Sequence, residues 1–380
     1  MKFLCTLAFM LLVLPMAMNA STIKTNNVTH TSSDISDKWA TITDELIQER
    51  LENIALPFEV NYTPVVKKYI KRYVALGPRE SEAMLGRSSL YFPIFEHYLS
   101  LYGLPKELKF LPMVESTLRP GVKSSAGAAG LWQMIPASAR YFGLTINGTV
   151  DQRLDPNQST EAAVKMLAAL YKQFGDWQLV MAAYNCGPGR VRKAIRYAKC
   201  NDYAAISKYL PKETQRYVPT FVAAAYLVNY YDVHGLMPKY PAYDLQETRT
   251  FVTHTSLRIS TIAKKTKVSV AILRKLNPGY LGNIIPASRK GQYLVLPTYA
   301  AESFRAYLNE KISTEVFIKP VDMIRTTYAT VAGDEIETLA LLFRCTVEDI
   351  MKWNLLQTKK IAVRQSLVLY LQRTNTTVRP

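Results

Sequence analysis

One carboxylic acid, Glu115, stands where the sequence can give it catalytic properties. Apolar residues recur around it at helical steps of three and four: Leu104, Leu108, Leu111, Val114 and Leu118. Glu115 therefore borders an apolar stripe, while Lys106 and Lys109 face water. A carboxyl group in apolar surroundings keeps its proton to higher pH, because ionisation there loses solvation. A general acid that works near neutrality needs this property. The alternative, for an isolated glutamate at a helix end, is that the side chain rotates into solvent.

Two later segments supply groups that suit a sugar. The stretch from Ser124 to Met134 is rich in Gly and Ala, so its backbone can approach another group closely. Within it, Trp132 offers a flat apolar surface and Gln133 offers both donors and acceptors. Further on, Tyr184 and Asn185 place a phenol and an amide at a predicted helix end. Aromatic faces combined with neutral hydrogen-bonding groups are typical of a carbohydrate site.

Other catalytic and cofactor patterns do not occur in the sequence. The four histidines lack paired metal-ligand spacing: His30, His97, His234 and His254. There is neither a Gly-rich phosphate loop ending in Lys-Ser/Thr nor a nucleophilic serine elbow. We therefore expect no metal and no cofactor.

The N-terminus and the net charge indicate export. Lys2 precedes an apolar run from Phe3 to Met18, and small and polar residues follow. This pattern predicts a signal peptide over 1–20, with an uncleaved membrane anchor as the alternative. The formal net charge of +17 favours an anionic polymer or surface as partner, although it can also serve solubility alone. Nucleic acid is not an expected partner of an exported protein.

The rest of the chain divides by pattern. Residues 21–41 are rich in Ser, Thr, Asn and Asp, which predicts a flexible leader. Residues 42–240 show helical periodicity broken by Gly and Pro, which predicts a mainly helical domain. Asp155-Pro156 precedes a strong helix predicted from about Ser159 to Phe174, which Gly175 ends. Asp176 is a typical N-cap for the next helix.

Three cysteines follow the predicted signal peptide: Cys186, Cys200 and Cys345. An odd number leaves at least one thiol without an intramolecular partner. Whether Cys186 and Cys200 pair stays open at this point, because spacing does not fix disulfide geometry.

Beyond residue 240 the pattern changes to short strands and short helices, and two segments match each other. Lys275 and Asn277 align with Lys352 and Asn354 at a constant offset of 77 residues. The match predicts two copies of a strand–helix–helix–strand unit, over 250–297 and 326–371, joined by a connector over 298–325.

Four separated motifs in the helical region carry a family resemblance. They are Glu115-Ser116, Gly130-Leu131-Trp132-Gln133, Ala183-Tyr184-Asn185 and the stretch Leu210–Pro219. In this order and spacing the region resembles the lytic transglycosylase domain with a goose-lysozyme-like fold. The last stretch is similar to the form found in the membrane-bound lytic murein transglycosylase D group.

The resemblance implies a reaction on peptidoglycan. Glu115 would protonate the glycosidic oxygen between N-acetylmuramic acid and N-acetylglucosamine, and then deprotonate the muramic C6 hydroxyl. That hydroxyl attacks C1, so a 1,6-anhydro end forms without hydrolysis. Ordinary glycosidases use two carboxylates, whereas the stretch 116–150 contains no Asp or Glu. The residues expected to contact substrate are Ser116, Ser124, Gln133, Met134, Tyr184, Asn185 and Tyr217.

The second repeat resembles a LysM module, a small carbohydrate-binding βααβ unit. The resemblance places N-acetylglucosamine contacts in two loops, at Gly333, Asp334, Glu335, Ile336, Asn354, Leu355 and Leu356. We also expect Asp334 to cap the first helix of the unit. The first repeat is degenerate, since Ser256-Leu257 replaces Gly-Asp, and its sugar binding stays open.

The predicted fold class is thus a mainly α lysozyme-like catalytic domain over 42–240, followed by small α+β LysM-like modules. The expected partner is the glycan strands of peptidoglycan, in the periplasm or cell envelope, with peripheral membrane association left open and no protein partner predicted. Two alternatives remain: a hydrolytic muramidase on the same fold, and a non-catalytic peptidoglycan-binding protein.

Overall fold

The computed structural model describes residues 39–288, 291–315, 323–331, 333–343, 345–354, 356–363 and 365–372. The predicted signal peptide and most of the predicted leader lie outside these residues. The leader is shorter than expected at its C-terminal end, because Trp39 is buried and its ring lies 6.0 Å from that of His234. No helix among the described residues combines the length and apolar character needed to cross a bilayer.

The first region is helical, as predicted. Its elements are α2 (Asp44–Glu52), α3 (Pro64–Lys71), the π-helix η1 (Arg72–Leu76), α4 (Pro78–Leu101), the 3₁₀ helix η2 (Lys106–Phe110), α5 (Leu111–Ser116), α6 (Pro136–Tyr141), α7 (Pro156–Phe174), α8 (Trp177–Cys186), α9 (Pro188–Ala198), α10 (Tyr203–Ser207) and α11 (Lys212–Tyr230). The side chain of Asp176 caps α8, which confirms the predicted N-cap. Asp155 caps α7, which begins at Pro156 and so three residues earlier than predicted.

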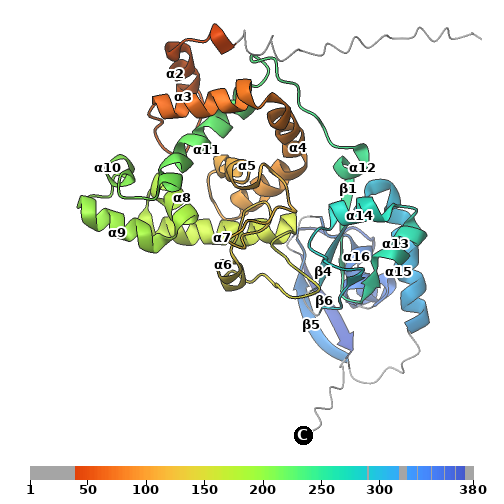
Figure 1. Ribbon diagram of the computed structural model, residues 1–380. Coiled ribbons are helices and arrows are strands. Elements are labelled where there is room, and N and C mark those ends of the chain that lie inside the picture. Colours follow the sequence, from red (N-terminus) through yellow and green to blue (C-terminus); the bar gives the residue numbers. More distant parts are fainter. Residues whose placement is uncertain are drawn as a thin grey trace, which may run out of the picture.

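Helix α11 runs through the middle of this domain and packs against α3, α5 and α8 (Figure 1). Its residues Phe221 and Tyr226 are fully buried. Trp132 is also in the core: its ring meets Phe95 edge-on at 5.1 Å, and its indole N–H donates to the Thr160 hydroxyl at 2.9 Å. The expectation that Trp132 offers a flat face to a sugar is therefore wrong.

Leu108, Leu111 and Leu118 of the apolar stripe around Glu115 are buried as predicted, whereas Leu104 and Val114 are half-buried. The stripe is not one continuous helix. Residues Lys106–Phe110 form a 3₁₀ turn, α5 then begins with Pro112 in its first turn, and Thr117 and Leu118 adopt left-handed conformations with φ of 51° and 59°. Proline is tolerated in a first turn because its missing N–H would have no helical partner there. The short helix α5 thus ends one residue after Glu115.

The C-terminal region contains the two predicted repeats. The first comprises β1 (Thr248–Thr253), β2 (Leu257–Arg258), α13 (Ile259–Thr266), α14 (Val270–Leu276), β3 (Ile284–Ile285) and β4 (Gln292–Pro297), preceded by α12 (Tyr243–Gln246). The second comprises β5 (Met323–Ala329), α16 (Ile336–Leu342), α17 (Val347–Trp353) and β6 (Ser366–Gln372). In each repeat the outer strands pair antiparallel, β1 with β4 and β5 with β6.

An asparagine at the end of the second helix holds each repeat together. Asn277 donates to the carbonyls of Leu273 and Val295 and accepts from the Val295 N–H. Asn354 makes the same three bonds, with Ile350 and Val368. The matching bonds confirm the alignment of the repeats.

The connector predicted over 298–325 is mostly structured. It contains the 3₁₀ turn η3 (Thr298–Ala300) and helix α15 (Ala301–Glu315). Phe304 and Leu308 of α15 are buried in the core of the first module. The helix therefore belongs to that module, a relation that sequence periodicity alone did not reveal.

The three cysteines named above are unpaired in the structure, so the disulfide left open between Cys186 and Cys200 does not form.

Candidate active site

A cleft of about 1100 Å³ lies in the helical domain. Helices α5, α8 and α11 and the loop between α5 and α6 supply its walls. Its lining includes most of the predicted substrate contacts: Glu115, Ser124, Gln133, Met134, Tyr184, Asn185 and Tyr217. Residues far apart in sequence thus meet around one space of a size suited to sugar rings.

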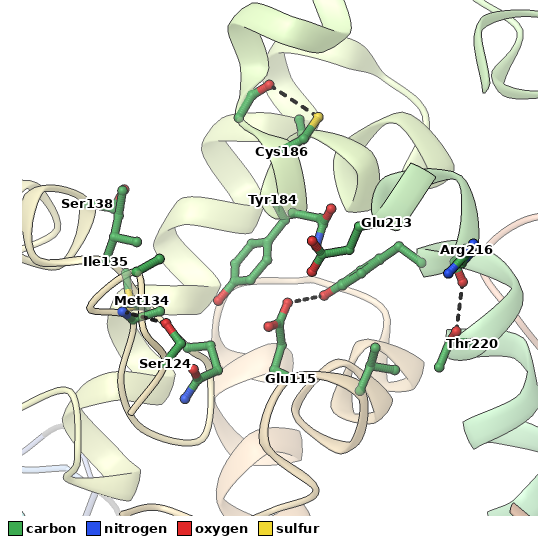
Figure 2. Close-up of a pocket in the computed structure, with 18 of the residues that line it drawn as sticks. Glu115, Ser124, Met134, Ile135, Ser138, Tyr184, Cys186, Glu213, Arg216 and Thr220 are labelled. Carbon is green, nitrogen blue, oxygen red and sulfur yellow. Dashed lines mark hydrogen bonds between the residues drawn. The ribbon is translucent and has the colours of Figure 1, made fainter. Parts of the chain in front are cut away.

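Glu115 stands at the last turn of α5 with its carboxyl group directed into the cleft (Figure 2). Its Oε1 accepts a hydrogen bond from the Tyr217 hydroxyl at 2.5 Å. Burial raises its pKa to about 7, the negative charge of Glu213 adds to the rise, and the Tyr217 hydrogen bond opposes it. The outward-rotated alternative is thereby excluded, and the carboxyl group has the pKa of a general acid at neutral pH.

Two phenols flank this carboxyl group. Tyr184 points toward Glu115 in Figure 2 and donates to the carbonyl oxygen of Trp132 at 2.6 Å. Burial first, and then the charge of Glu115, hold the pKa of both Tyr184 and Tyr217 well above the usual value. Both phenols therefore keep their protons and can act as donors over the whole physiological range.

Gln133 and Ser124 shape the loop on the opposite wall. The Gln133 side chain donates to the carbonyls of Val122 and Gly130, at 3.2 and 2.8 Å. The Ser124 hydroxyl accepts from the Ala128 N–H at 3.1 Å. Both residues thus hold the loop as well as line the cleft.

Asn185 also combines two roles. Its Oδ1 accepts a hydrogen bond from the Thr214 hydroxyl at 2.7 Å, which ties the end of α8 to the start of α11. The residue still lines the cleft.

Ser116 does not reach the cleft. It is buried, and its hydroxyl donates to the carbonyls of Pro112 and Leu131, at 3.0 and 2.9 Å. The expectation that Ser116 contacts substrate is therefore wrong. The residue fastens α5 to the 130–133 loop instead, and so fixes the backbone next to Glu115.

Several cleft residues escaped the sequence analysis. Glu213 and Arg216 lie within the Leu210–Pro219 motif, so a search of that motif for charged residues would have found them. Arg72, in the π-helix η1, has no such signal, because nothing in the sequence places η1 beside α5. Glu213 brings a second carboxylate to the cleft, from a helix remote in sequence.

The cleft continues into a second hollow of about 720 Å³ between α3, α4 and α11. Tyr69, Arg72 and Arg216 line both spaces, and Lys68 lines the second. This end of the groove is therefore rich in cationic side chains.

The predicted sugar contacts of the second LysM module divide by role. Gly333 has φ of +91° and makes the tight turn. Asp334 accepts from the Tyr328 hydroxyl and the Val331 N–H, so it closes this turn and does not cap α16. Ile336 is 1% exposed and belongs to the core, which leaves it unavailable to a sugar.

The other predicted sugar contacts of the second module have structural roles where the structure describes them. Glu335 forms ion pairs with Arg249 and Arg305 of the first module, at 3.3 and 2.6 Å. Asn354 makes the structural bonds described above, and Leu356 is half-buried against the module core. Leu355 lies outside the described residues.

Comparison with protein families agrees with this architecture. Residues 93–207 match the transglycosylase SLT domain, residues 247–311 match the LysM-like domain of lytic transglycosylase MltD, and residues 328–369 match the LysM domain. The second match extends to residue 311 and so includes most of α15. A lysozyme-like SLT domain with LysM domains after it defines a peptidoglycan lytic transglycosylase.

Individual relatives narrow the class. The chain is 30% identical over 343 residues to the membrane-bound lytic murein transglycosylase D of Escherichia coli K12, covering 88% of this chain and 72% of the relative. It therefore belongs to the membrane-bound lytic murein transglycosylase D family. The soluble lytic murein transglycosylase of the same organism is 33% identical over 141 residues, covering 35% of this chain and 22% of that protein.

Among solved structures, the 70 kDa soluble lytic transglycosylase from Escherichia coli matches at 23% identity and a TM-score of 0.35, covering 54% of this chain and 34% of that one. A TM-score this low adds no weight to the assignment.

Proposed function

We propose that this transglycosylase cuts the β-1,4 bond between N-acetylmuramic acid and N-acetylglucosamine without water, with Glu115 as the single general acid and base. One observation carries the proposal: the Glu115 carboxyl group lies in a sugar-sized cleft with a pKa of about 7. At this pKa, a single group can both give and take a proton near neutrality.

In the first step, protonated Glu115 donates its proton to the glycosidic oxygen, and the bond from that oxygen to muramic C1 breaks. Because Tyr217 donates to Oε1, the other carboxyl oxygen is the one that carries the proton. The muramic N-acetyl group assists departure from the opposite face. In the second step, the Glu115 carboxylate takes the proton of the C6 hydroxyl as that oxygen bonds to C1. A 1,6-anhydro end forms, and Glu115 is again protonated.

The neighbouring residues hold the sugar and the acid. Ser124, Gln133 and Met134 form one wall of the cleft, and Tyr184 and Asn185 form the other. Ser116 is a positioning residue, since it acts only through the backbone beside Glu115. The cationic end of the groove, at Arg72 and Arg216, would meet the carboxylates of peptide-bearing glycan strands.

The second LysM module would bind the same polymer outside the cleft. Its loop 357–360 is exposed, and so leaves room for a glycan strand. Tethering the polymer in this way raises its local concentration without adding catalytic groups. An exported chain fits this substrate, so we also propose that residues 1–20 direct it to the periplasm or cell envelope. The Escherichia coli relative is a membrane-bound lytic murein transglycosylase, which supports peripheral membrane association of this chain.

Digestion of purified sacculi followed by mass spectrometry tests the proposal. We expect muropeptides with 1,6-anhydro ends, and a loss of roughly 10²–10⁴-fold in rate for Glu115→Gln, as is usual when a general acid is removed. The variant should still sediment with sacculi.

Two results would contradict the proposal. Products with only reducing ends would make the protein a hydrolytic muramidase. Unchanged glycan release by Glu115→Gln would remove this residue from the chemistry and leave a binding role for the cleft.

A further inference from the structure

The loop that follows the matching asparagine, Asn277 or Asn354, is exposed in one LysM-like module and buried in the other. In the second module, the loop after Asn354 is exposed from residue 357 to 360. In the first module, the aligned loop after Asn277 has Gly279 and Tyr280 buried. A loop that corresponds to a sugar-contact loop is thus covered by another part of the chain.

The helical domain covers it. The Asp151 N–H donates to the Gly279 carbonyl at 2.9 Å, and the Leu281 N–H donates to the Thr149 carbonyl at 2.9 Å. These two bonds join backbone segments in an antiparallel arrangement, like a short piece of sheet. The loop before α7 and the first module are therefore joined by main-chain hydrogen bonds.

Side chains complete the contact. Val150, from the helical domain, is 2% exposed and lies in the hydrophobic core of the first module. Opposite it, the Tyr280 hydroxyl donates to the Tyr293 carbonyl at 2.5 Å. A Cβ at Gly279 would already be in van der Waals contact with Cβ of Asp155, at 3.4 Å, so a longer side chain there would press against the helical domain.

Within the first module, a short strand pair joins the two loops that correspond to the predicted sugar contacts. Strands β2 and β3 pair there, with Leu257 opposite Ile285 and Arg258 opposite Ile284. Leu257 is 1% exposed, at the position where the second module has Asp334. Backbone pairing within the module thus links the two loops between which a sugar would have to lie.

A chain of polar contacts leads from this junction to the cleft. Asp151 and Arg153 form a buried bidentate ion pair at 2.8 and 2.9 Å. Arg153 also donates to the carbonyls of Gly127 and Met134, at 2.6 and 3.2 Å. Met134 lines the cleft that holds Glu115. Residues 149–151, which bond to the first module, are thus continuous with Arg153, which holds the cleft loop.

We propose that the first LysM-like module is a docking module. It uses the counterpart of a sugar-contact loop to hold residues 149–151, and through Arg153 it fixes the cleft loop 124–134. It does not contribute to glycan binding. The catalytic part of this inference rests on the proposed function, whereas the docking itself does not.

Two variants of the full-length protein test it from opposite sides. Gly279→Glu places bulk and charge against Asp155. Val150→Ser removes the apolar contact while leaving the sequence of the module intact. The matched control is Ala271→Glu, which puts the same side chain at an exposed position of α14 in the first module.

Hydrogen exchange followed by mass spectrometry measures the protection of the backbone amides at the contact between the first module and the helical domain. Both variants should speed exchange in peptides that contain Asp151 and Leu281, and then in those that span 124–134. Turnover of short soluble glycan fragments should fall roughly 5–10-fold in kcat/KM, because the cleft loop loses its support. Sacculus binding, measured with Glu115→Gln added, should stay within about twofold of the parent. The control should change none of these.

The proposal is overturned if exchange near Asp151 stays as slow in both variants as in the parent. It is also overturned if sacculus binding falls together with turnover, because the first module would then bind glycan. A parent protein that cuts no glycan would defeat the proposed function only, since exchange would still report on the docking.

Discussion

At the scale of single residues, the proposed chemistry depends on the protonation of Glu115. Burial raises its pKa to about 7, and Tyr217 opposes the rise by donating to the charged form. A donor to a carboxylate stabilises the ionised state and so lowers the pKa. The two effects together set the pH at which the acid is available.

This balance predicts a pH effect for Tyr217→Phe. The general acid must carry its proton at the start of the reaction, so the rate of the parent should fall as pH rises through about 7. Removing the hydrogen bond raises the pKa of Glu115 further, and the falling limb of the pH–rate profile should move to higher pH. We expect the maximal rate to drop about tenfold as well, since Tyr217 no longer holds the carboxyl group.

Tyr230→Phe is the matched control. It removes a hydroxyl group from the same helix, which donates to the backbone carbonyl of Arg50 at 3.0 Å, and Tyr230 does not line the cleft. Its pH profile should coincide with that of the parent. A Tyr217→Phe profile without any shift would mean that Tyr217 does not act on Glu115.

Sequence reasoning identified Glu115 but misjudged two of its neighbours. The periodic apolar stripe placed Glu115 at the border of a buried helical face. The sugar-type residues of the two later segments then favoured a buried carboxyl group over a side chain rotated into solvent. The roles of Ser116 and Trp132 depend on partners at Leu131 and Thr160. Such partners are set by tertiary packing, which the local pattern does not contain.

At the scale of elements, the cleft loop depends on close backbone packing. Gly130 has φ of +84°, and a Cβ there would lie 1.8 Å from the carbonyl oxygen of Arg153. Gly127 has a similar φ of +80° but no atom within 4 Å of the same position. Substitutions at the two glycines therefore distinguish the cost of a left-handed backbone conformation from the cost of a steric clash.

We therefore expect Gly127→Ala to cost about 1–2 kcal/mol in the free energy of unfolding, through the left-handed conformation alone. Gly130→Ala should cost several kcal/mol more, because two backbone segments must move apart. It should also reduce glycan cleavage. Urea denaturation of both variants provides the measurement, and equal losses of stability would contradict the packing argument.

Helix caps and repeats were predictable, whereas the breaks in helices were less so. Asp176 caps α8 as its position indicates, because an N-cap bond is local. Aligned residues such as Asn277 and Asn354 revealed the duplication, because a repeated folding unit repeats its sequence pattern. The region before Glu115 divides into a 3₁₀ turn and a short helix, since Pro105 and Pro112 interrupt a pattern that apolar spacing made continuous.

At the scale of the whole molecule, the first module should support cleavage and the second should support binding to sacculi, independently of each other. A chain ending after residue 311 keeps the first module with most of α15 and removes the second. It should cut short glycan fragments at the rate of the full chain. Its affinity for sacculi should fall by roughly 10-fold or more, because the tether is lost.

Co-sedimentation with sacculi and turnover of short fragments measure these two properties. Comparison with Glu115→Gln in both lengths separates binding from cutting. Equal sacculus affinity of the short and full chains would show that the second module does not act as a tether.

The paired asparagine clamp has an evolutionary consequence. Because Asn277 and Asn354 join helix to strand by identical bonds, each module keeps this connection whatever surface the following loop presents. After a duplication, one copy could therefore change the surface of that loop and still keep its fold. A duplicated recognition module could in this way become a structural support. Its substitutions would then be constrained by the domain that it contacts.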